Sequence, residues 1–170
     1  MSPKAQPPLP FDPIEEAARH WAQRWDGVHA MRAVTSLMRA QQLLIARLDE
    51  VLRPHRLSFA RYEALVLLTF SRAGELPLGK MGDRLQVHPT SVTSIVNRLE
   101  ASGYVRRRPH PRDGRTVLAA ITDSGRAVVE VATADLVAGD FGLGVLDEAD
   151  LDQVTALLTP LRRAAGDFAT

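Results

Sequence analysis

Five arginines lie within a span of ten residues, at positions 106, 107, 108, 112 and 115, and Asp113 is the only acidic residue among them. A guanidinium binds phosphate through two hydrogen bonds and also enters the minor groove of DNA, where the negative potential is enhanced. The segment 109–115 contains Asp113-Gly114 and predicts a hairpin loop between short strands at 104–108 and 116–121. Asp113 has two interpretations that are compatible with each other: it can hold a guanidinium in place, and it can set the turn geometry. Although arginine runs also occur on plain solvated surfaces, this cluster indicates a polyanion partner.

The segment from Pro89 to Ser102 carries the second set of chemically useful side chains. Its apolar residues recur at helical spacing and predict a helix with one buried face: Val92, Ile95, Val96 and Leu99. The other face carries Thr90, Ser91, Ser94, Asn97 and Arg98. Hydroxyl and amide groups suit base edges, whereas Arg98, near the end of the helix, suits a phosphate or a guanine. Such residues also form ordinary solvated faces, and it is the arginine-rich hairpin beside them that favours contact with DNA.

A shorter helix is predicted directly before this segment, over residues 78–85, and Gln86 to His88 form a tight connector. Two short helices joined by a three-residue turn are typical of a helix-turn-helix, whose second helix enters the major groove. The hairpin that follows adds a wing. The predicted fold class is therefore mainly α with a small β-hairpin wing (α+β).

Four regions are expected along the chain. Residues 1–11 are Pro-rich and predicted to be disordered, and residues 12–56 are predicted to form N-terminal dimerisation helices, beginning at Asp12-Pro13 and ending at Pro54. Residues 57–122 are the predicted DNA-binding lobe, in which Ser58 caps a helix that reaches about Arg72. Residues 123–170 are predicted to form C-terminal dimerisation helices.

Long apolar stripes occur at both ends of the chain, over residues 28–53 and 147–168. They are too long for one small lobe to cover, which predicts a homodimer. Within the last helix, Pro160 is expected to cause a kink or an early end.

Composition limits the other function classes. The chain has no cysteine, and its five histidines show no metal-ligand spacing, so neither a metal site nor a cofactor is expected. Nucleophile elbows and phosphate-binding glycine loops are absent from the sequence, so no enzyme is expected. No apolar stretch is long enough to span a bilayer, and the N-terminus lacks the apolar core of a signal peptide, which predicts a cytoplasmic protein.

The net charge of +1 hides an uneven distribution. Residues 1–122 carry a balance of +7, and residues 123–170 carry a balance of −6. The basic part of the chain is the part that contains the predicted DNA-binding lobe, which is the electrostatic pattern of a nucleic-acid-binding protein.

The run Val87-His88-Pro89-Thr90-Ser91-Val92-Thr93-Ser94-Ile95-Val96-Asn97-Arg98-Leu99-Glu100-Ala101-Ser102-Gly103-Tyr104-Val105 resembles the recognition helix of the MarR family of bacterial regulators. The run Pro111-Arg112-Asp113-Gly114-Arg115 is similar to the wing of that family. The residues that follow the wing are similar to its joint with the next helix: Leu118, Ile121, Thr122, Gly125 and Arg126.

The resemblance implies a homodimer in which N- and C-terminal helices of two chains interdigitate and two winged lobes bind halves of a pseudo-palindromic operator in double-stranded DNA. It implies a repressor that a small aromatic or anionic effector releases from DNA. The predicted DNA-binding residues are Ser58, Lys80, His88, Thr90, Ser91, Thr93, Ser94, Asn97, Arg98, Arg107, Arg112, Asp113 and Arg115.

The N-terminal helix with Trp21 and Trp25 resembles the urate-responsive branch of the family, which makes these residues and Glu63 candidates for ligand binding. Ile95 stands where that branch carries Arg, and Glu63 stands where it carries Asp, so urate is not the expected ligand. Dimer packing is the other interpretation of the two tryptophans. The absence of cysteine excludes the thiol-oxidation switch of the peroxide-sensing branch.

A winged-helix protein-interaction module without DNA binding is the alternative function. Loss of the wing arginines would indicate such a module, but Arg112 and Arg115 are both present. The operator sequence, the target genes and the effector are not determined by the residues.

Overall fold

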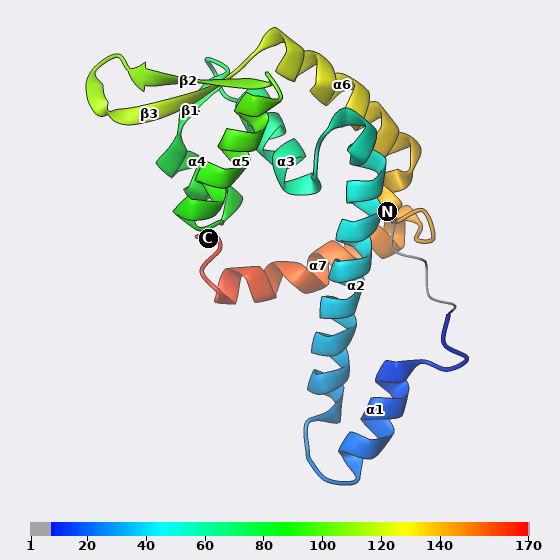
Figure 1. The fold of residues 1–170 in the computed structure, drawn as a ribbon. Coiled ribbons are helices and arrows are strands. Elements are labelled where there is room, and N and C mark those ends of the chain that lie inside the picture. Colours follow the sequence, from blue (N-terminus) through cyan, green and yellow to red (C-terminus); the bar gives the residue numbers. More distant parts are fainter. Residues whose placement is uncertain (1–7, 170) are drawn as a thin grey trace. The chain divides into compact units, whose positions relative to one another are not determined.

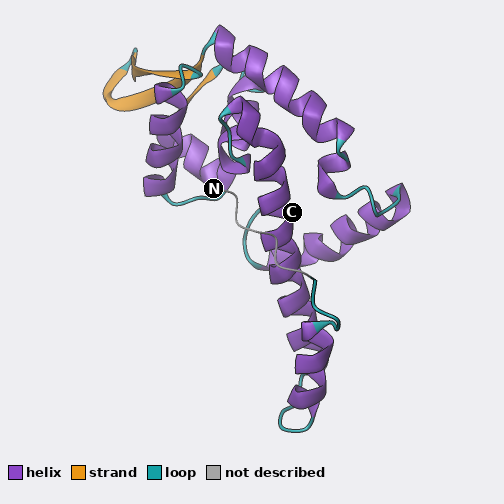
Figure 2. Ribbon diagram, turned by 45° about the vertical axis from the view of Figure 1, so that its right-hand side comes forward, coloured by secondary structure: helices purple, strands orange, loops and turns teal. Residues whose placement is uncertain are grey.

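A computed structural model describes residues 8–169 of the chain, so most of the segment 1–11 that was expected to be disordered lies outside the described residues. The contacts divide the chain into two compact units, Met1–Ala46 and Arg47–Thr170. Helix α2 (Val28–Leu52) crosses from the first unit into the second. The second unit contains all the strands, which lie at one end of it, and helices make up most of its remainder (Figures 1 and 2).

The first unit is a helical hairpin of α1 (Pro13–Ala22) and the N-terminal part of α2. Asp12 caps α1, because its Oδ1 accepts a hydrogen bond from the Ile14 N–H at 2.8 Å. Gly27 turns the chain with a φ of 74°, a left-handed conformation that glycine adopts without strain. An ion pair between Glu15 and Arg32 joins the two helices.

Helix α3 (Phe59–Thr69) begins where the sequence predicts, but another residue supplies its cap. The 3₁₀ turn η1 (Arg53–His55) follows α2 directly and contains Pro54. Ser58 occupies the N-cap position of α3, yet the Phe59 N–H donates to Oδ1 of Asp49, at 2.7 Å. Asp49 lies on α2, so this cap depends on how the helices meet and is not visible in the local sequence. Helix α3 also ends earlier than the expected Arg72.

The helix-turn-helix is confirmed as α4 (Leu78–Leu85) and α5 (Pro89–Ala101). Gln86 takes a left-handed conformation with a φ of 53° and ends α4. On α5, Val92, Val96 and Leu99 are at most 1% exposed. Burial of this apolar stripe fixes the rotation of α5 about its own axis and turns its polar face outward.

The sheet has three strands in the order β1-β3-β2, namely β1 (Glu75–Pro77), β3 (Asp113–Ile121) and β2 (Val105–His110), all antiparallel. The sequence predicted only two strands and a seven-residue loop. In the structure the strands extend almost to the tip, and the turn comprises only Pro111 and Arg112. Strand β1 was missed because three residues that end in proline show no alternation, and only pairing with β3 makes them a strand.

The winged lobe is built around side chains with almost no solvent exposure. The largest of them come from helices far apart in the sequence: Leu52, Leu65, Leu68, Met81, Leu99 and Leu136. The hairpin of β2 and β3 projects beyond α4 and α5, as Figure 1 shows.

The C-terminal part of the chain consists of α6 (Asp123–Ala138), the short turn η2 (Asp140–Gly142) and α7 (Glu148–Ala164). Thr122 and Asp147 cap α6 and α7 through their side-chain oxygens. An early end at Pro160 is not found, since α7 continues to Ala164. Among the described helices, none is long and apolar enough to cross a membrane.

The joint between the wing and α6 depends on a glycine. A Cβ on Gly125 would lie 2.2 Å from the carbonyl oxygen of Tyr104 and 2.8 Å from Cγ1 of Ile121. The same carbonyl accepts a hydrogen bond from the Thr122 N–H at 3.0 Å, so the backbone cannot move away without breaking that bond.

We therefore expect Gly125→Ala to destabilise the fold by about 1–3 kcal/mol, as an overpacked core does. Chemical denaturation monitored by circular dichroism measures this change. Gly79→Ala on α4 is the matched control, because its Cβ would meet nothing within 4 Å, and it should be neutral or stabilising by up to about 1 kcal/mol. Equal stability of the two variants would contradict the conclusion that the joint has no room for a Cβ at residue 125.

Candidate nucleic-acid interface

The outward face of α5 presents the small polar residues that the sequence predicted. Thr90, Ser91, Ser94 and Arg98 are all exposed. Thr93 is exposed as well, and its hydroxyl donates to the Pro89 carbonyl within the helix at 3.1 Å. Ser91 and Ser94 lie one helical turn apart, so both can follow the same edge of a groove.

His88 has a structural task at the start of α5. Its Nδ1 accepts a hydrogen bond from the Thr90 N–H at 3.3 Å and lies 3.1 Å from the Thr90 hydroxyl. This contact satisfies one of the backbone donors that every helix leaves open at its N-terminus. His88 thus sets where α5 begins, and the residue is exposed at this N-terminus.

Arg107 fastens the wing to α5. Its backbone N–H donates to Oε1 of Glu100 at 3.0 Å, and its Nη1 donates to Oε2 at 2.5 Å. Its Nη2 donates to Oδ1 of Asn97 at 2.5 Å and to the Thr93 carbonyl at 3.5 Å. We call these contacts the Arg107 clamp. The guanidinium expected to meet DNA is thus engaged by the protein.

The clamp also fixes the chemistry of its two partners. Two hydrogen bonds from Arg107 lower the pKa of Glu100, and the one from its backbone N–H has a larger effect than the one from its side chain. The Glu100 carboxylate therefore stays charged. A guanidinium only donates hydrogen bonds, and therefore the oxygen of the Asn97 amide has to face Arg107. The NH₂ group of Asn97 is the part left to meet a ligand.

Asp113 organises the tip of the wing. Its Oδ2 accepts from the Thr116 hydroxyl at 2.7 Å, and its Oδ1 accepts from the Arg115 N–H at 3.1 Å. Both hydrogen bonds lower the pKa of Asp113, and the one from Thr116 has the larger effect. Of the two interpretations that the sequence left open, the structure shows the turn-forming one.

A register shift places Arg115 outside the regular ladder. Pro109 pairs with Val117, but the next residue, His110, pairs with Asp113. Residues 114–116 therefore lie opposite no residue of β2. A bulge of this kind re-aims side chains near the end of a hairpin, and Arg115 lies within it, close to the tip turn.

The hairpin arginines divide into two groups. Arg107 pairs with Glu100, and Arg108 pairs with Glu75. Arg106, Arg112 and Arg115 are exposed and make no ion pair within the described residues 8–169. The sequence count of five arginines thus becomes three cations that are available to an external anion.

The remaining predicted DNA-binding residues lie elsewhere on the second unit. Ser58 is half-buried, and its Oγ accepts from Nε of Arg61 at 3.2 Å. Lys80 is exposed on α4, beside a hollow that Arg84 and His110 also line. Arg84 and His110 were not predicted, because they are far apart in sequence and meet only through the fold.

The candidate ligand-binding residues divide between the two units. Trp21 and Trp25 lie in the first unit with ring centroids 4.9 Å apart, and Nε1 of Trp21 donates to the Asp26 carbonyl at 2.8 Å. This pair closes the turn between α1 and α2. Glu63 lies on α3, where desolvation raises the pKa of its carboxyl.

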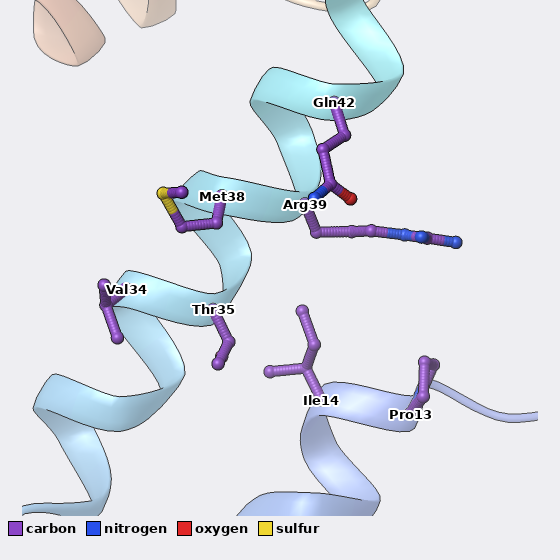
Figure 3. Close-up of a pocket in the computed structure, with 7 residues that line it drawn as sticks. All are labelled: Pro13, Ile14, Val34, Thr35, Met38, Arg39 and Gln42. Atoms are coloured by element: carbon purple, nitrogen blue, oxygen red, sulfur yellow. The ribbon is translucent and has the colours of Figure 1, made fainter.

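A groove in the first unit lies between α1 and α2 and has a volume of about 460 Å³. Figure 3 shows Ile14 pointing from α1 toward α2, with Val34 and Met38 along the α2 wall. Its lining residues are Pro13, Ile14, Val34, Thr35, Met38, Arg39 and Gln42. In the described part of the chain, no group of three or more metal-ligating side chains occurs.

Comparisons with known proteins agree with this geometry. The MarR family model matches residues 61–117, which run from α3 through the helix-turn-helix into the wing. Sco5413, a MarR family transcriptional regulator from Streptomyces coelicolor, is 59% identical in sequence, with a TM-score of 0.79. The match covers 85% of this chain and 100% of Sco5413.

Two further relatives show the reach of the likeness. Mb0904 from Mycobacterium bovis, an uncharacterised HTH-type transcriptional regulator, is 38% identical over 66 residues. This match covers 39% of the present chain and only 46% of the length of Mb0904. Sco3205, another MarR family transcriptional regulator from Streptomyces coelicolor, was solved in complex with DNA. It shares the fold at 23% identity and a TM-score of 0.75, over 83% of this chain and 94% of its own.

The match to Sco5413 covers the whole of that protein at high identity, and the family model spans the helix-turn-helix and part of the wing. The chain belongs to the MarR family of winged helix transcriptional regulators and is not an enzyme.

Proposed function

We propose that this protein represses transcription as a homodimer that binds the two halves of a pseudo-palindromic DNA operator. The observation that carries the proposal is the outward polar face of α5 beside a wing with three exposed arginines that form no ion pair among residues 8–169. A helix of this kind fits the major groove, and a hairpin beside it reaches the neighbouring minor groove. The DNA complex of Sco3205, which has the same fold, supports this arrangement.

In this proposal, Ser91 and Ser94 recognise the bases of the operator. Their hydroxyls donate or accept, and both side chains are exposed on the face opposite the buried stripe of α5. Asn97 adds an NH₂ donor, because the Arg107 clamp occupies its oxygen. Arg98, near the end of the helix where it leaves the groove, binds a phosphate.

The dimer follows from apolar surface that each unit leaves uncovered. In the first unit, Val34, Met38 and Leu43 on α2 are more than half exposed. In the second unit, α7 has no buried residue, and its Leu157 and Leu161 are 69% and 61% exposed. Surfaces of this kind mark protein interfaces, and a second copy of the chain supplies a self-complementary partner for them.

Release by a small aromatic or anionic effector completes the proposal. The groove of Figure 3 has apolar walls and, in Arg39, a cation for an acidic group. Its volume lies in the usual range for small-molecule sites, roughly 300–1,000 Å³.

The wing is tested by Arg115→Ala. Each lobe loses one guanidinium at the bulge, so operator affinity should fall roughly tenfold or more, and the slope of log affinity against log salt should become shallower by about one per contact. Fluorescence anisotropy at several salt concentrations measures both quantities. Arg53→Ala is the control for loss of one charge, since Arg53 is exposed but pairs with Glu50 away from the hairpin. If Arg115→Ala behaves like Arg53→Ala, the wing is not a DNA element.

The recognition helix is tested by comparing Ser94→Ala with Arg98→Ala. Loss of a base contact at Ser94 should cost about 1 kcal/mol on the operator, roughly fivefold, and should change which base is preferred there. Arg98→Ala should weaken operator and random DNA by similar factors. Asn97→Ala is a poorer test, because it also removes a partner of Arg107.

Selection of bound sequences from a random pool, followed by titration of single sites, gives both answers. Thermal unfolding of each variant has to match that of the parent. An unchanged base preference in Ser94→Ala, together with unchanged affinity in Arg98→Ala, would remove α5 as the recognition element.

The dimer is tested by Leu157→Glu on α7. A charge on the apolar face should shift the protein to monomers at micromolar concentration, which sedimentation velocity detects directly. Thr155→Glu is the matched control, because Thr155 is exposed on the other side of the same helix and should leave the dimer intact. A parent protein that sediments as a monomer would contradict the dimer model outright.

A further inference from the structure

A second basic surface lies on the winged lobe, apart from the outward face of α5. We call it the basic hollow and define it by Arg72, Lys80, Arg84 and His110. It has a volume of about 470 Å³ and lies between the α3–β1 connection, helix α4 and the wing tip. The same α4 thus helps to form the helix-turn-helix and one wall of this hollow.

No carboxylate forms an ion pair with the arginines and the lysine of the basic hollow among the described residues. Glu75 is the acidic residue of the lining, but its side chain is only 16% exposed and already pairs with Arg108. Asp83, next to Arg84 in the sequence, lines a different hollow, between α4 and α5. Within the described residues, Arg72, Lys80 and Arg84 make no ion pair, so the hollow attracts anions.

Apolar side chains form much of the remaining lining. Leu76 and Leu118 are nearly buried, and Pro77 and Pro111 lie beside them. Such walls strengthen the electrostatic attraction between the cations and an incoming anion, because they replace polarisable water near the charges. Phe70, which is 83% exposed, also lines the hollow.

The hollow is continuous with the wing. His110 and Pro111 are the residues where β2 passes into the tip turn, and Arg112 and Arg115 follow within five positions. A DNA strand that meets the wing tip therefore passes the mouth of the hollow. Arg72, Lys80 and Arg84 are exposed, the first on the α3–β1 connection and the other two one turn apart on α4, and such a row suits an extended backbone better than a small enclosed anion.

We propose that the basic hollow binds a backbone phosphate of the DNA, and that Arg72 and Arg84 are DNA contacts in addition to α5 and the wing. The inference rests on the proposed function and extends its interface to the outer side of α4. Lys80 is the only member of this set that the sequence identified.

The test compares three proteins on the operator and on a random duplex of equal length: the parent, the double variant Arg72→Ala/Arg84→Ala, and the double variant Arg72→Lys/Arg84→Lys. The alanine variant should lose roughly tenfold in affinity on both duplexes, with a salt slope shallower by about one or two per lobe. The lysine variant keeps the charge and should retain most of the slope. Arg53→Ala again controls for loss of charge outside the hollow.

Four outcomes are decisive. Parallel losses on both duplexes in the alanine variant, with recovery in the lysine variant, support the phosphate contact. A parent that binds operator while the alanine variant keeps the same slope overturns this inference and leaves the proposed function standing, whereas a parent that binds no DNA overturns the proposed function itself. Unchanged DNA binding, combined with thermal stabilisation of the parent but not the alanine variant by inorganic phosphate, would assign the hollow to a small anion and overturn the DNA contact.

Discussion

The Arg107 clamp is the contact on which the geometry of the DNA-binding surface depends. The two elements that act on neighbouring grooves in the proposed function, α5 and the wing, are joined through one side chain that reaches Glu100, Asn97 and the Thr93 carbonyl. The hairpin alone would be a marginally stable two-stranded ribbon. Fastening to α5 on one edge and pairing of β3 with β1 on the other give it a fixed position.

The clamp explains why arginines of one cluster have different tasks. A guanidinium that already has carboxylate and amide partners gains little from a phosphate, since binding would only exchange one set of hydrogen bonds for another. Arg107 and Arg108 are of this kind, because Glu100 and Glu75 pair with them. Arg106, Arg112 and Arg115 keep their full capacity. Arg84 on α4 belongs with these unpaired arginines, because it has no carboxylate partner among the described residues.

Local signals were sufficient to predict the helix-turn-helix. Its two helices and its connector depend on residues within a few positions of one another, such as Gln86 and His88. Sequence reasoning failed where the partner belongs to a different helix or strand. Strand β1, the cap that Asp49 gives to α3, and the pairing of Arg107 with Asn97 all join segments that only the fold brings together. Residue type alone could not show that Arg107 is already paired with Glu100 and Asn97, and its contact with DNA stays a prediction.

The basic hollow is a surface that the sequence could not predict, because its cations are distant from one another along the chain. Arg72, Arg84 and His110 span almost forty positions and form no motif, yet β1 and the wing tip place them around one depression. The ion pair between Glu75 and Arg108 determines the charge of the hollow. An unpaired Glu75 would neutralise one of the neighbouring cations, but its carboxylate is already paired with Arg108 of the wing. The three residues of β1 therefore do more than extend the sheet. They carry Glu75 to Arg108, anchor the wing by its second edge, and leave the cations of α4 and the α3–β1 connection free of Glu75, as the proposed phosphate contact requires.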